Sequence, residues 1–282
     1  MITCDKRIEL GTNRDFRDRV VVITGAAGGI GKALSRRFAK AGARLGLTDL
    51  DVQGVDALSK ELAAEGTDCF GFGLDVTDET ACHQAMDSVV KRFGRLDVLI
   101  NNAGITHRSA FARTASKVYG RVMAVNYFGS LYCTQAALDY LIEQKGLIIV
   151  ISSVAGFSPL LGRTGYAASK HALHGLFDSL RAELREKGVG VTIVCPGFTA
   201  TNIYKRALDE DGSLTSHPQS TVGAPASPES VAEAVFRAAT RDKRLLILSV
   251  VGRLTRFLNK FFPDFYERKM ARTLRSELDR QG

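Results

Sequence analysis

The chain has 282 residues, of which 45% are hydrophobic and 24% charged, so it can bury one good core and is too short for two generous domains. Its apolar runs are much shorter than the roughly 20 residues that span a bilayer, and its charged N-terminus lacks the apolar centre of a signal peptide. The five cysteines form no CxxC pair, which argues against a disulfide framework or a zinc site and favours a reducing cytoplasm.

Short β-branched runs alternate with longer helical patterns from residue 19 onward. This alternation predicts an α/β, doubly wound Rossmann fold, in which helices cover both faces of a parallel sheet. The expected strands are almost continuously apolar, as strands buried on both faces usually are. Seven strands are expected, at residues 19–25, 43–49, 69–76, 96–102, 147–153, 189–197 and 245–251. Before the last of them, "SPESVAEAVFRAATRD" has helical periodicity, with serine at the cap and proline at the first helical position.

The expected organisation is one domain with an extension at each end. Residues 1–18 are expected to be a flexible lead-in, residues 19–251 the Rossmann-type catalytic domain, and residues 252–282 a basic amphipathic helical extension. The polar, irregular stretch at 209–228 cannot be core, and we expect a mobile lid over about residues 202–227.

A glycine cluster follows the first expected strand, in "TGAAGGIG". Glycines let the backbone approach a pyrophosphate, and the helix N-terminus that follows offers free N–H groups. The expected cofactor-binding residues of this turn are Gly25, Gly28, Gly29, Ile30 and Gly31. Asp49 follows at the end of the second strand, close to the spacing at which an acidic residue meets the adenosine ribose. Its carboxylate would repel a 2′-phosphate, so we expect NAD rather than NADP.

Tyr166 and Lys170 lie four residues apart in "GYAASKHALHG", and therefore share one face of an expected helix. A free phenol titrates near pH 10, and a neighbouring ammonium, with a positively charged oxidised nicotinamide, favours the phenolate. Tyr166 is thus the candidate general acid and base, and no metal is expected, because hydride transfer is the chemistry of the cofactor.

The motifs TGxxxGxG, NNAG (101–104) and YxxxK, in this order, resemble the short-chain dehydrogenase/reductase family over about residues 19–251. The resemblance implies that Ser153 is the catalytic serine, which bonds the substrate oxygen, and that Asn126 holds a structural water. It also implies that Lys170 bonds the nicotinamide ribose. Further cofactor-binding positions implied by the resemblance are Asp75, Val76, Asn102, Ala103, Gly104, Pro196, Gly197, Thr199 and Thr201, together with Tyr166 and Lys170 themselves.

The family resemblance also places a group of mostly apolar side chains near the substrate. With no obvious arginine clamp among them, we expect a medium-to-large apolar secondary alcohol or ketone of steroid, lipid-derived or aryl type. The expected substrate-side residues are Ser153, Val154, Phe157, Pro159, Leu160, Phe198, Ile203 and Tyr204.

Positive charge is concentrated in the C-terminal extension. The formal net charge is +8, and residues 241–282 carry 11 Lys or Arg against 5 Asp or Glu, so the rest is nearly neutral and no nucleic acid partner is expected. Leu254, Phe257, Leu258, Phe261 and Phe262 follow a helical spacing, with basic residues on the opposite side and Pro263 ending the helix. Such a helix can cover a cleft, contact a partner subunit or lie on an anionic membrane surface; we favour packing against the molecule itself.

Two readings compete with an NAD-dependent alcohol dehydrogenase or ketoreductase. The first is a regulator that binds the dinucleotide without turnover, but such a protein need not keep Ser153, Tyr166 and Lys170 together. The second is an adaptor that binds a membrane or nucleic acid through the basic tail, but this function would not explain Asp49 and the glycine turn. The family resemblance suggests a homodimer or homotetramer built on the helices that carry Asn126 and Tyr166.

Overall fold

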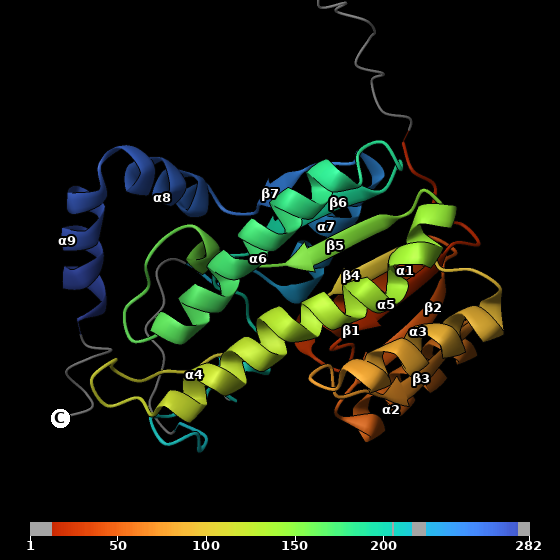
Figure 1. Cartoon of the computed structure of the whole chain (residues 1–282), viewed down its shortest axis with the longest axis horizontal. Coiled ribbons are helices and arrows are strands. Elements are labelled where there is room, and N and C mark those ends of the chain that lie inside the picture. Colours follow the sequence, from red (N-terminus) through yellow and green to blue (C-terminus); the bar gives the residue numbers. More distant parts are fainter. Residues whose placement is uncertain (1–12, 205, 216–223, 276–282) are drawn as a thin grey trace, which may run out of the picture.

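Seven parallel strands form one sheet at the centre of the molecule. The computed structural model describes residues 13–204, 206–215 and 224–275, and the sheet has the order β3-β2-β1-β4-β5-β6-β7 (Figure 1). The seven strands predicted from the sequence are confirmed, although each is shorter than its expected range and the last has only three residues. Their bounds are β1 (Val20–Thr24), β2 (Arg44–Asp49), β3 (Cys69–Gly73), β4 (Val98–Asn101), β5 (Leu147–Ile151), β6 (Gly190–Cys195) and β7 (Leu245–Ile247).

Successive side chains of each strand enter opposite halves of the core. In β1, Val20 and Val22 join one hydrophobic cluster while Val21 and Ile23 join the other. The first cluster lies under α3 (Glu79–Phe93), α5 (Gly129–Glu143) and α6 (Thr164–Glu183), and the second lies under α1 (Gly29–Ala39), α2 (Val52–Ala64) and α7 (Pro228–Thr240). The fold is therefore doubly wound, and its strand order reverses between β1 and β4, where the loops part to form a crevice.

Two of the predicted helix boundaries are found at the residues that the sequence indicates. Ser227 caps α7, its side chain accepting a hydrogen bond from the Ser230 N–H at 3.1 Å, and Pro228 is the first helical residue. Pro263 separates α8 (Val250–Phe261) from α9 (Pro263–Leu274).

The strand expected at residues 245–251 ends at Ile247. Ser249 begins a helix instead, because its Oγ accepts a hydrogen bond from the Gly252 N–H at 2.9 Å and so caps α8. Val250 and Val251 are consequently helical, although their β-branched side chains favour a strand.

The segments expected to be a lead-in and a lid are partly anchored. Residues 1–12 of the lead-in, and residue 205 and residues 216–223 of the lid, lie outside the described part of the chain. Phe16 is 2% exposed and packs against Phe38 and Phe236, so the lead-in contributes to the core. In the lid, the backbone of Leu208 exchanges hydrogen bonds with Thr106 and Arg108.

Helices α8 and α9 lie beyond the carboxyl ends of the strands, apart from the helices that cover the sheet (Figure 1). Gly252 brings α8 close to the body, since a Cβ at this position would lie 3.0 Å from the side chain of Val154. Among the helices of the described ranges, none is both long and apolar enough to cross a membrane.

Candidate active site

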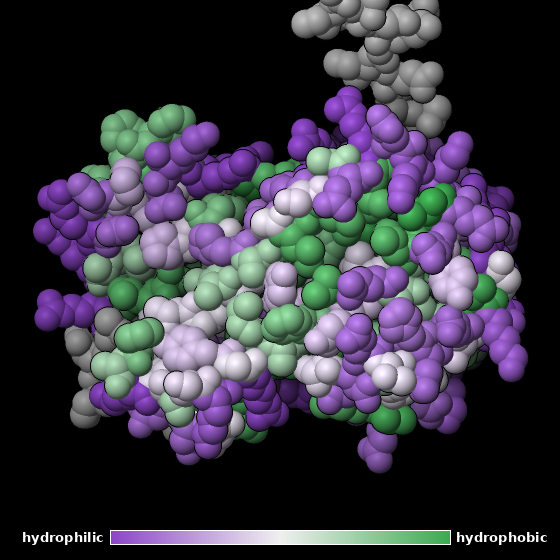
Figure 2. Space-filling view, in the orientation of Figure 1, coloured by the Kyte–Doolittle hydropathy of each residue, from purple (hydrophilic) through white to green (hydrophobic). Residues whose placement is uncertain are grey.

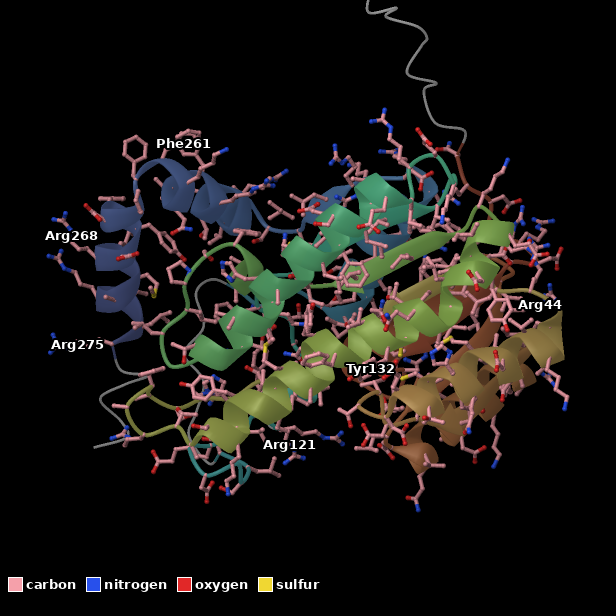
Figure 3. All side chains as sticks on the ribbon, viewed as in Figure 1. Arg44, Arg121, Tyr132, Phe261, Arg268 and Arg275 are labelled. Carbon is pink, nitrogen blue, oxygen red and sulfur yellow. The ribbon has the colours of Figure 1, made fainter. Side chains whose placement is uncertain are left out.

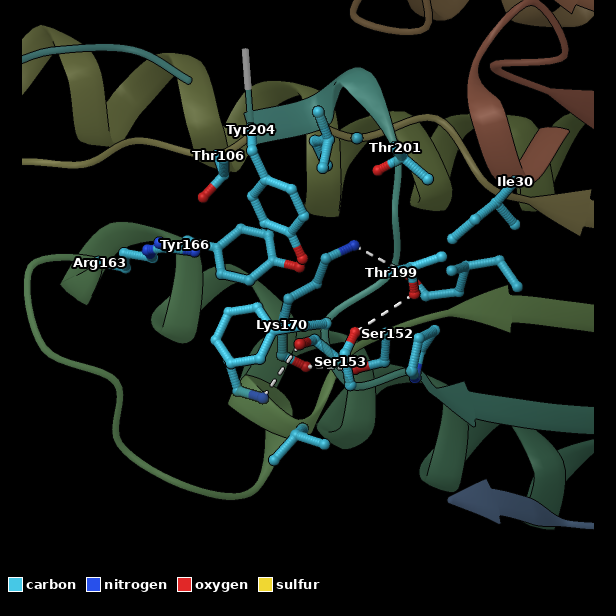
Figure 4. Close-up of a pocket in the computed structure, with 18 of the residues that line it drawn as sticks. Ile30, Thr106, Ser152, Ser153, Arg163, Tyr166, Lys170, Thr199, Thr201 and Tyr204 are labelled. Carbon is cyan, nitrogen blue, oxygen red and sulfur yellow. Dashed lines mark hydrogen bonds between the residues drawn. The ribbon is translucent and has the colours of Figure 1, made fainter. Parts of the chain in front are cut away.

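One large pocket opens at the carboxyl ends of the parallel strands, where α/β sheets commonly bind ligands. Its cavity volume is about 850 Å³, and its walls come from the loops after β1 to β6, from the start of α6, and from α8 and α9. Figure 4 shows Ser153, Tyr166, Lys170 and Tyr204 gathered on one side of this space, with Thr199, Thr201 and Ile30 farther along it.

The glycine turn after β1 needs glycine at specific positions. Gly25 has a φ of +66°, and a Cβ there would lie 2.8 Å from the Cα of Ala103. A Cβ at Gly31 would collide with the Gly25 carbonyl oxygen. At Gly28, by contrast, the Gly25 oxygen at 3.3 Å is the single neighbour within 4 Å among the described residues, so this position faces open pocket space.

The N-terminus of α1 is suited to bind an anionic group. Gly28 is its N-cap residue and provides no capping side chain, so the first N–H groups of the helix have no side-chain acceptor there. Gly28, Gly29, Ile30 and Gly31 all line the pocket. Free N–H groups, the positive end of the helix dipole and a turn without side chains together fit a pyrophosphate.

Asp49 ends β2 and lines the same pocket. Its Oδ2 accepts a hydrogen bond from the Ala27 N–H at 2.8 Å, and its Oδ1 accepts one from the Asp51 N–H at 2.9 Å. The carboxylate therefore holds the glycine turn in place, and its two oxygens retain lone pairs for ribose hydroxyl groups. Leu50, the next residue, is 71% exposed and provides no cation for a 2′-phosphate.

The NNAG segment fixes the floor of the crevice. The Asn102 side chain donates hydrogen bonds to the carbonyl oxygens of Thr24 and Gly25, each at 2.9 Å, and so ties β4 to the glycine turn. Gly104 lies beside the catalytic candidates, because a Cβ there would be 3.2 Å from Asn126 Oδ1 and 3.5 Å from Lys170 Nζ.

Ser153, Tyr166 and Lys170 converge from two elements. Ser153 lies two residues after the end of β5, and its Oγ accepts a hydrogen bond from the Ala155 N–H at 3.1 Å. Tyr166 and Lys170 lie one turn apart on α6, and Lys170 Nζ lies 5.7 Å from the centre of the Tyr166 ring. The ammonium donates a hydrogen bond to the Ile151 carbonyl oxygen at 2.9 Å, which anchors it to the end of β5.

Burial sets the proton affinities of this pair. It raises the pKa of Tyr166 to about 12, and nearby Tyr204 acts in the same direction, while the hydrogen bond with Ser153 and the charge of Arg163 lower it. Burial also lowers the pKa of Lys170 to about 8. The lowered tyrosine pKa expected from the sequence is therefore not found in the chain alone, because desolvation of the phenolate outweighs the neighbouring positive charges.

Asn126 is fully buried in a π-helical turn, Ala124–Phe128, between α4 (Ser116–Met123) and α5. Its Oδ1 accepts a hydrogen bond from the Ile105 N–H at 2.8 Å, and its Nδ2 donates to the Ile105 carbonyl oxygen and to Ser169 Oγ. Ser169 in turn donates to the Tyr166 carbonyl oxygen at 2.8 Å. Asn126 thus connects the loop after β4 to α6 from behind the pocket wall. π-helical turns are frequent at functional sites.

His107 also holds the start of α6, through a hydrogen bond with its backbone. It is fully buried, and its Nε2 accepts a hydrogen bond from the Gly165 N–H at 2.9 Å, one residue before Tyr166. Burial and the charge of Arg163 lower the pKa of His107 to about 4, so the imidazole is neutral and can accept this bond. No sequence pattern links residue 107 to residue 165, so this role is visible only in the structure.

Most of the expected substrate-side residues line the pocket, but Phe157 is an exception. Its ring packs edge-on against His174 with centroids 6.2 Å apart, and Arg256 lies over it at 5.9 Å. Its carbonyl oxygen accepts a hydrogen bond from Asn259 Nδ2 at 2.9 Å. Phe157 therefore joins α6 to α8 and does not line this pocket, unlike the other expected substrate-side residues.

The remaining site residues predicted from the sequence are brought together in one cavity, apart from Asn126 behind its wall. The pocket lining contains Gly25, Gly28, Gly29, Ile30, Gly31, Asp49, Asp75, Val76, Asn102, Ala103, Gly104, Ser153, Val154, Pro159, Leu160, Tyr166, Lys170, Pro196, Gly197, Phe198, Thr199, Thr201, Ile203 and Tyr204.

Basic side chains that no sequence motif indicates also line the pocket. They are Arg121, Arg163, Arg206 and Lys269, which come from four separate segments. Arg163 is 3% exposed, and its guanidinium lies 5.7 Å from the centre of the Tyr204 ring. The expectation that the site lacks arginine is therefore corrected: the pocket combines apolar walls with positive charge near Tyr166.

Comparisons with known proteins agree with this geometry. A sequence model described as short chain dehydrogenase matches residues 19–212. Dehydrogenase/reductase SDR family member 7B of Bos taurus is 37% identical over 270 residues, which cover 93% of this chain and 83% of that protein. The protein of that name from Danio rerio is 34% identical over 278 residues, covering 95% of this chain and 89% of its own length. Among solved structures, a short chain dehydrogenase/reductase from Burkholderia phymatum in complex with NAD matches with a TM-score of 0.81 and 25% identity, over 89% of this chain and 96% of that one.

Proposed function

This chain belongs to the short-chain dehydrogenase/reductase family, and from that premise we propose that it is an NAD-dependent alcohol dehydrogenase or ketoreductase with Tyr166 as general acid and base. The observation that carries the proposal is the convergence of Ser153, Tyr166 and Lys170 in a pocket that also contains the glycine turn. A protein that only senses the dinucleotide has no use for this convergence.

The residues of the pocket fit a nicotinamide dinucleotide along its length. The uncapped start of α1 is the proposed pyrophosphate site, Asp49 the ribose site, and Asp75 with Val76 the adenine site. Thr199 and Thr201 lie between Ile30 and Tyr166 in Figure 4, and we propose that they hold the nicotinamide carboxamide together with Pro196 and Gly197, which line the same pocket. When bound, the cofactor supplies the hydride chemistry.

The protein's own residues handle the proton. In alcohol oxidation Tyr166 accepts the proton of the substrate hydroxyl on its phenolic oxygen, and in reduction it returns the proton to the developing alkoxide. Ser153 bonds the substrate oxygen and stabilises charge that develops on it. Arg163 favours the phenolate as a positive charge at this end of the pocket, and Lys170, 5.7 Å from the centre of the Tyr166 ring, is proposed to act in the same direction when it is protonated.

The substrate that fits this lining has an apolar body and a negatively charged or strongly polar end. Val154, Leu160, Phe198 and Ile203 provide apolar walls, whereas Arg163 places a buried cation near Tyr166. We propose a medium-to-large secondary alcohol or ketone of this kind. We further propose a homodimer through α5 and α6, which lie side by side on one face of the sheet (Figure 1).

The direct test measures reduced nicotinamide by absorbance, with NAD or NADP and a panel of neutral and acidic alcohols. We expect turnover with NAD, and loss of turnover with retained NAD binding in Tyr166→Phe. The control for cofactor choice is Asp49→Asn, which keeps the shape of the side chain and should raise activity with NADP relative to NAD. A silent panel combined with tight NAD binding would favour the sensor instead.

A further inference from the structure

The outer side of α8 and α9 carries an exposed aromatic cluster, which we define as Phe257, Phe261, Phe262 and Phe265. These side chains are 53%, 57%, 55% and 56% exposed, respectively. The Phe257 ring lies 5.0 Å from the Phe261 ring and 6.2 Å from the Phe262 ring, measured between centroids. Val250 extends the same apolar side toward the start of α8, at 71% exposed.

This exposure differs from the expectation that the apolar side of the extension packs inward. The residues of α8 that face the body are Gly252, Thr255 and, in part, Leu258, so the helix is held by a different stripe from the one that carries the phenylalanines. In Figure 3, Phe261 projects away from the molecule at the junction of the two helices. Figure 2 shows hydrophobic surface at this corner next to hydrophilic surface over α9.

Basic residues surround the cluster. Residues 250–275 contain seven Lys or Arg against two acidic residues, Asp264 and Glu267, and all seven basic residues are exposed. Arg268 points outward from α9 (Figure 3), and Lys260 lies over the Phe261 ring at 5.5 Å. Aromatic side chains with flanking lysine and arginine are the composition that binds the interface of an anionic bilayer.

We propose that α8 and α9 dock this protein on the surface of an anionic lipid membrane, with the aromatic cluster inserted among the acyl chains and the basic residues at the headgroups. The positive charge of this corner favours a membrane, rather than a second copy of the chain, as the partner that covers the aromatic cluster. Two copies that paired through this corner would each bring the same excess of positive charge, which opposes association, whereas an anionic surface attracts it.

Docking at this corner also places one wall of the pocket against the bilayer. Val251, Leu254 and Leu258 of α8, with Met270 and Leu274 of α9, line the cavity from the inner side of the same two helices. An apolar substrate dissolved in the membrane would then reach the pocket without crossing water. This second step rests on the proposed function, whereas the docking does not.

The test is flotation of the full chain with vesicles, without substrate or cofactor. We expect binding to vesicles of phosphatidylcholine mixed with phosphatidylserine, and weak binding to phosphatidylcholine alone. The triple variant Phe257→Ser, Phe261→Ser, Phe262→Ser should bind anionic vesicles roughly tenfold or more weakly, and Arg268→Gln with Arg272→Gln should reduce binding and its dependence on salt.

Phe111→Ser is the matched control, because Phe111 is 72% exposed but lies outside α8 and α9; it should float like the unaltered protein. An unaltered chain that stays in solution with anionic vesicles, or a triple variant that floats equally well, overturns the proposal. Conversion of a dimer to a monomer by the triple variant, with no change in flotation, assigns the cluster to a second copy and also overturns it. If the chain floats with anionic vesicles but oxidises no alcohol in the absorbance assay, membrane docking is supported and the proposed enzyme activity is overturned instead.

Discussion

The buried ammonium of Lys170 lowers the stability of the folded chain. Its pKa is lowered by burial to about 8, whereas lysine in an unfolded chain titrates near 10.5. Below pH 8 both states hold the proton and the cost of burying the charge is fully present. Between pH 8 and pH 10.5 the unfolded chain binds more protons, so stability rises with pH.

Lys170→Met should therefore abolish turnover and stabilise the fold. We expect a gain of about 2 kcal/mol at pH 7, because the variant removes the buried charge but also loses the hydrogen bond to the Ile151 carbonyl oxygen. Urea unfolding of both proteins at pH 7 and pH 9.5 measures this gain and its pH dependence. A variant less stable than the unaltered chain at pH 7 would contradict it.

The buried His107 is expected to lower the free energy of unfolding in mild acid. Its pKa is lowered to about 4 by burial, so the unfolded chain, with histidine near 6.5, binds more protons between these values. Stability therefore falls as the pH is lowered from 6.5 toward 4. Between pH 7.5 and pH 5 we expect the unaltered protein to lose about 2 kcal/mol more than His107→Gln, whose amide oxygen can still accept from Gly165. Equal losses in urea unfolding would show that His107 has no part in acid sensitivity.

Within the glycine turn, some glycines are needed for the fold and others for cofactor binding. A Cβ at Gly31 collides with the Gly25 carbonyl oxygen, so Gly31→Ala should displace the start of α1, destabilise the protein by about 2 kcal/mol and weaken NAD binding. Gly28→Ala places its methyl group at the pocket, 3.3 Å from the Gly25 carbonyl oxygen, a contact that a small shift relieves, so it should weaken NAD binding with little change in stability. Urea unfolding and NAD titration of both variants test the pair, and equal destabilisation would contradict the argument.

The elements themselves were predictable from the sequence where local chemistry decides them. The strands β1 and β5 are continuous apolar runs because both faces are buried, and Ser227 with Pro228 gives the start of α7 directly. Val250 and Val251 have β-branched side chains that favour a strand, yet the cap at Ser249 outweighs that preference and both residues are helical.

The site could be predicted only as far as its motifs extend. Ser153, Tyr166 and Lys170 occur at fixed spacings, so the sequence identifies them, and the structure places all three in the pocket. Phe157 and Arg163 lie in irregular segments on either side of a loop, where no periodicity tells which way a side chain points. Phe157, which is expected in the pocket, lies outside it, and Arg163, which no motif indicates, lines it.

For the whole molecule, α8 and α9 serve the pocket rather than the core. Both hydrophobic clusters of the sheet draw on residues between Phe16 and Leu248, so the Rossmann domain buries its apolar residues without the extension. The inner side of the extension walls the pocket, and Gly252 of α8 lies against Val154, one of the expected substrate-side residues. Its loss should therefore affect the substrate and not the dinucleotide.

A chain that ends after Ser249 should fold cooperatively and bind NAD with an affinity within about threefold of that of the full chain. Its KM for apolar substrates should rise about tenfold or more, because α8 and α9 provide much of the apolar wall of the pocket. NAD titration, urea unfolding and steady-state kinetics measure these three properties on one preparation. Met270→Ser with Leu274→Ser is the milder control, since it keeps both helices and should raise KM in the same direction by a smaller factor. Loss of NAD binding on truncation would mean that the extension organises the whole crevice, and an unchanged KM would mean that substrate binds without contact to α8 and α9.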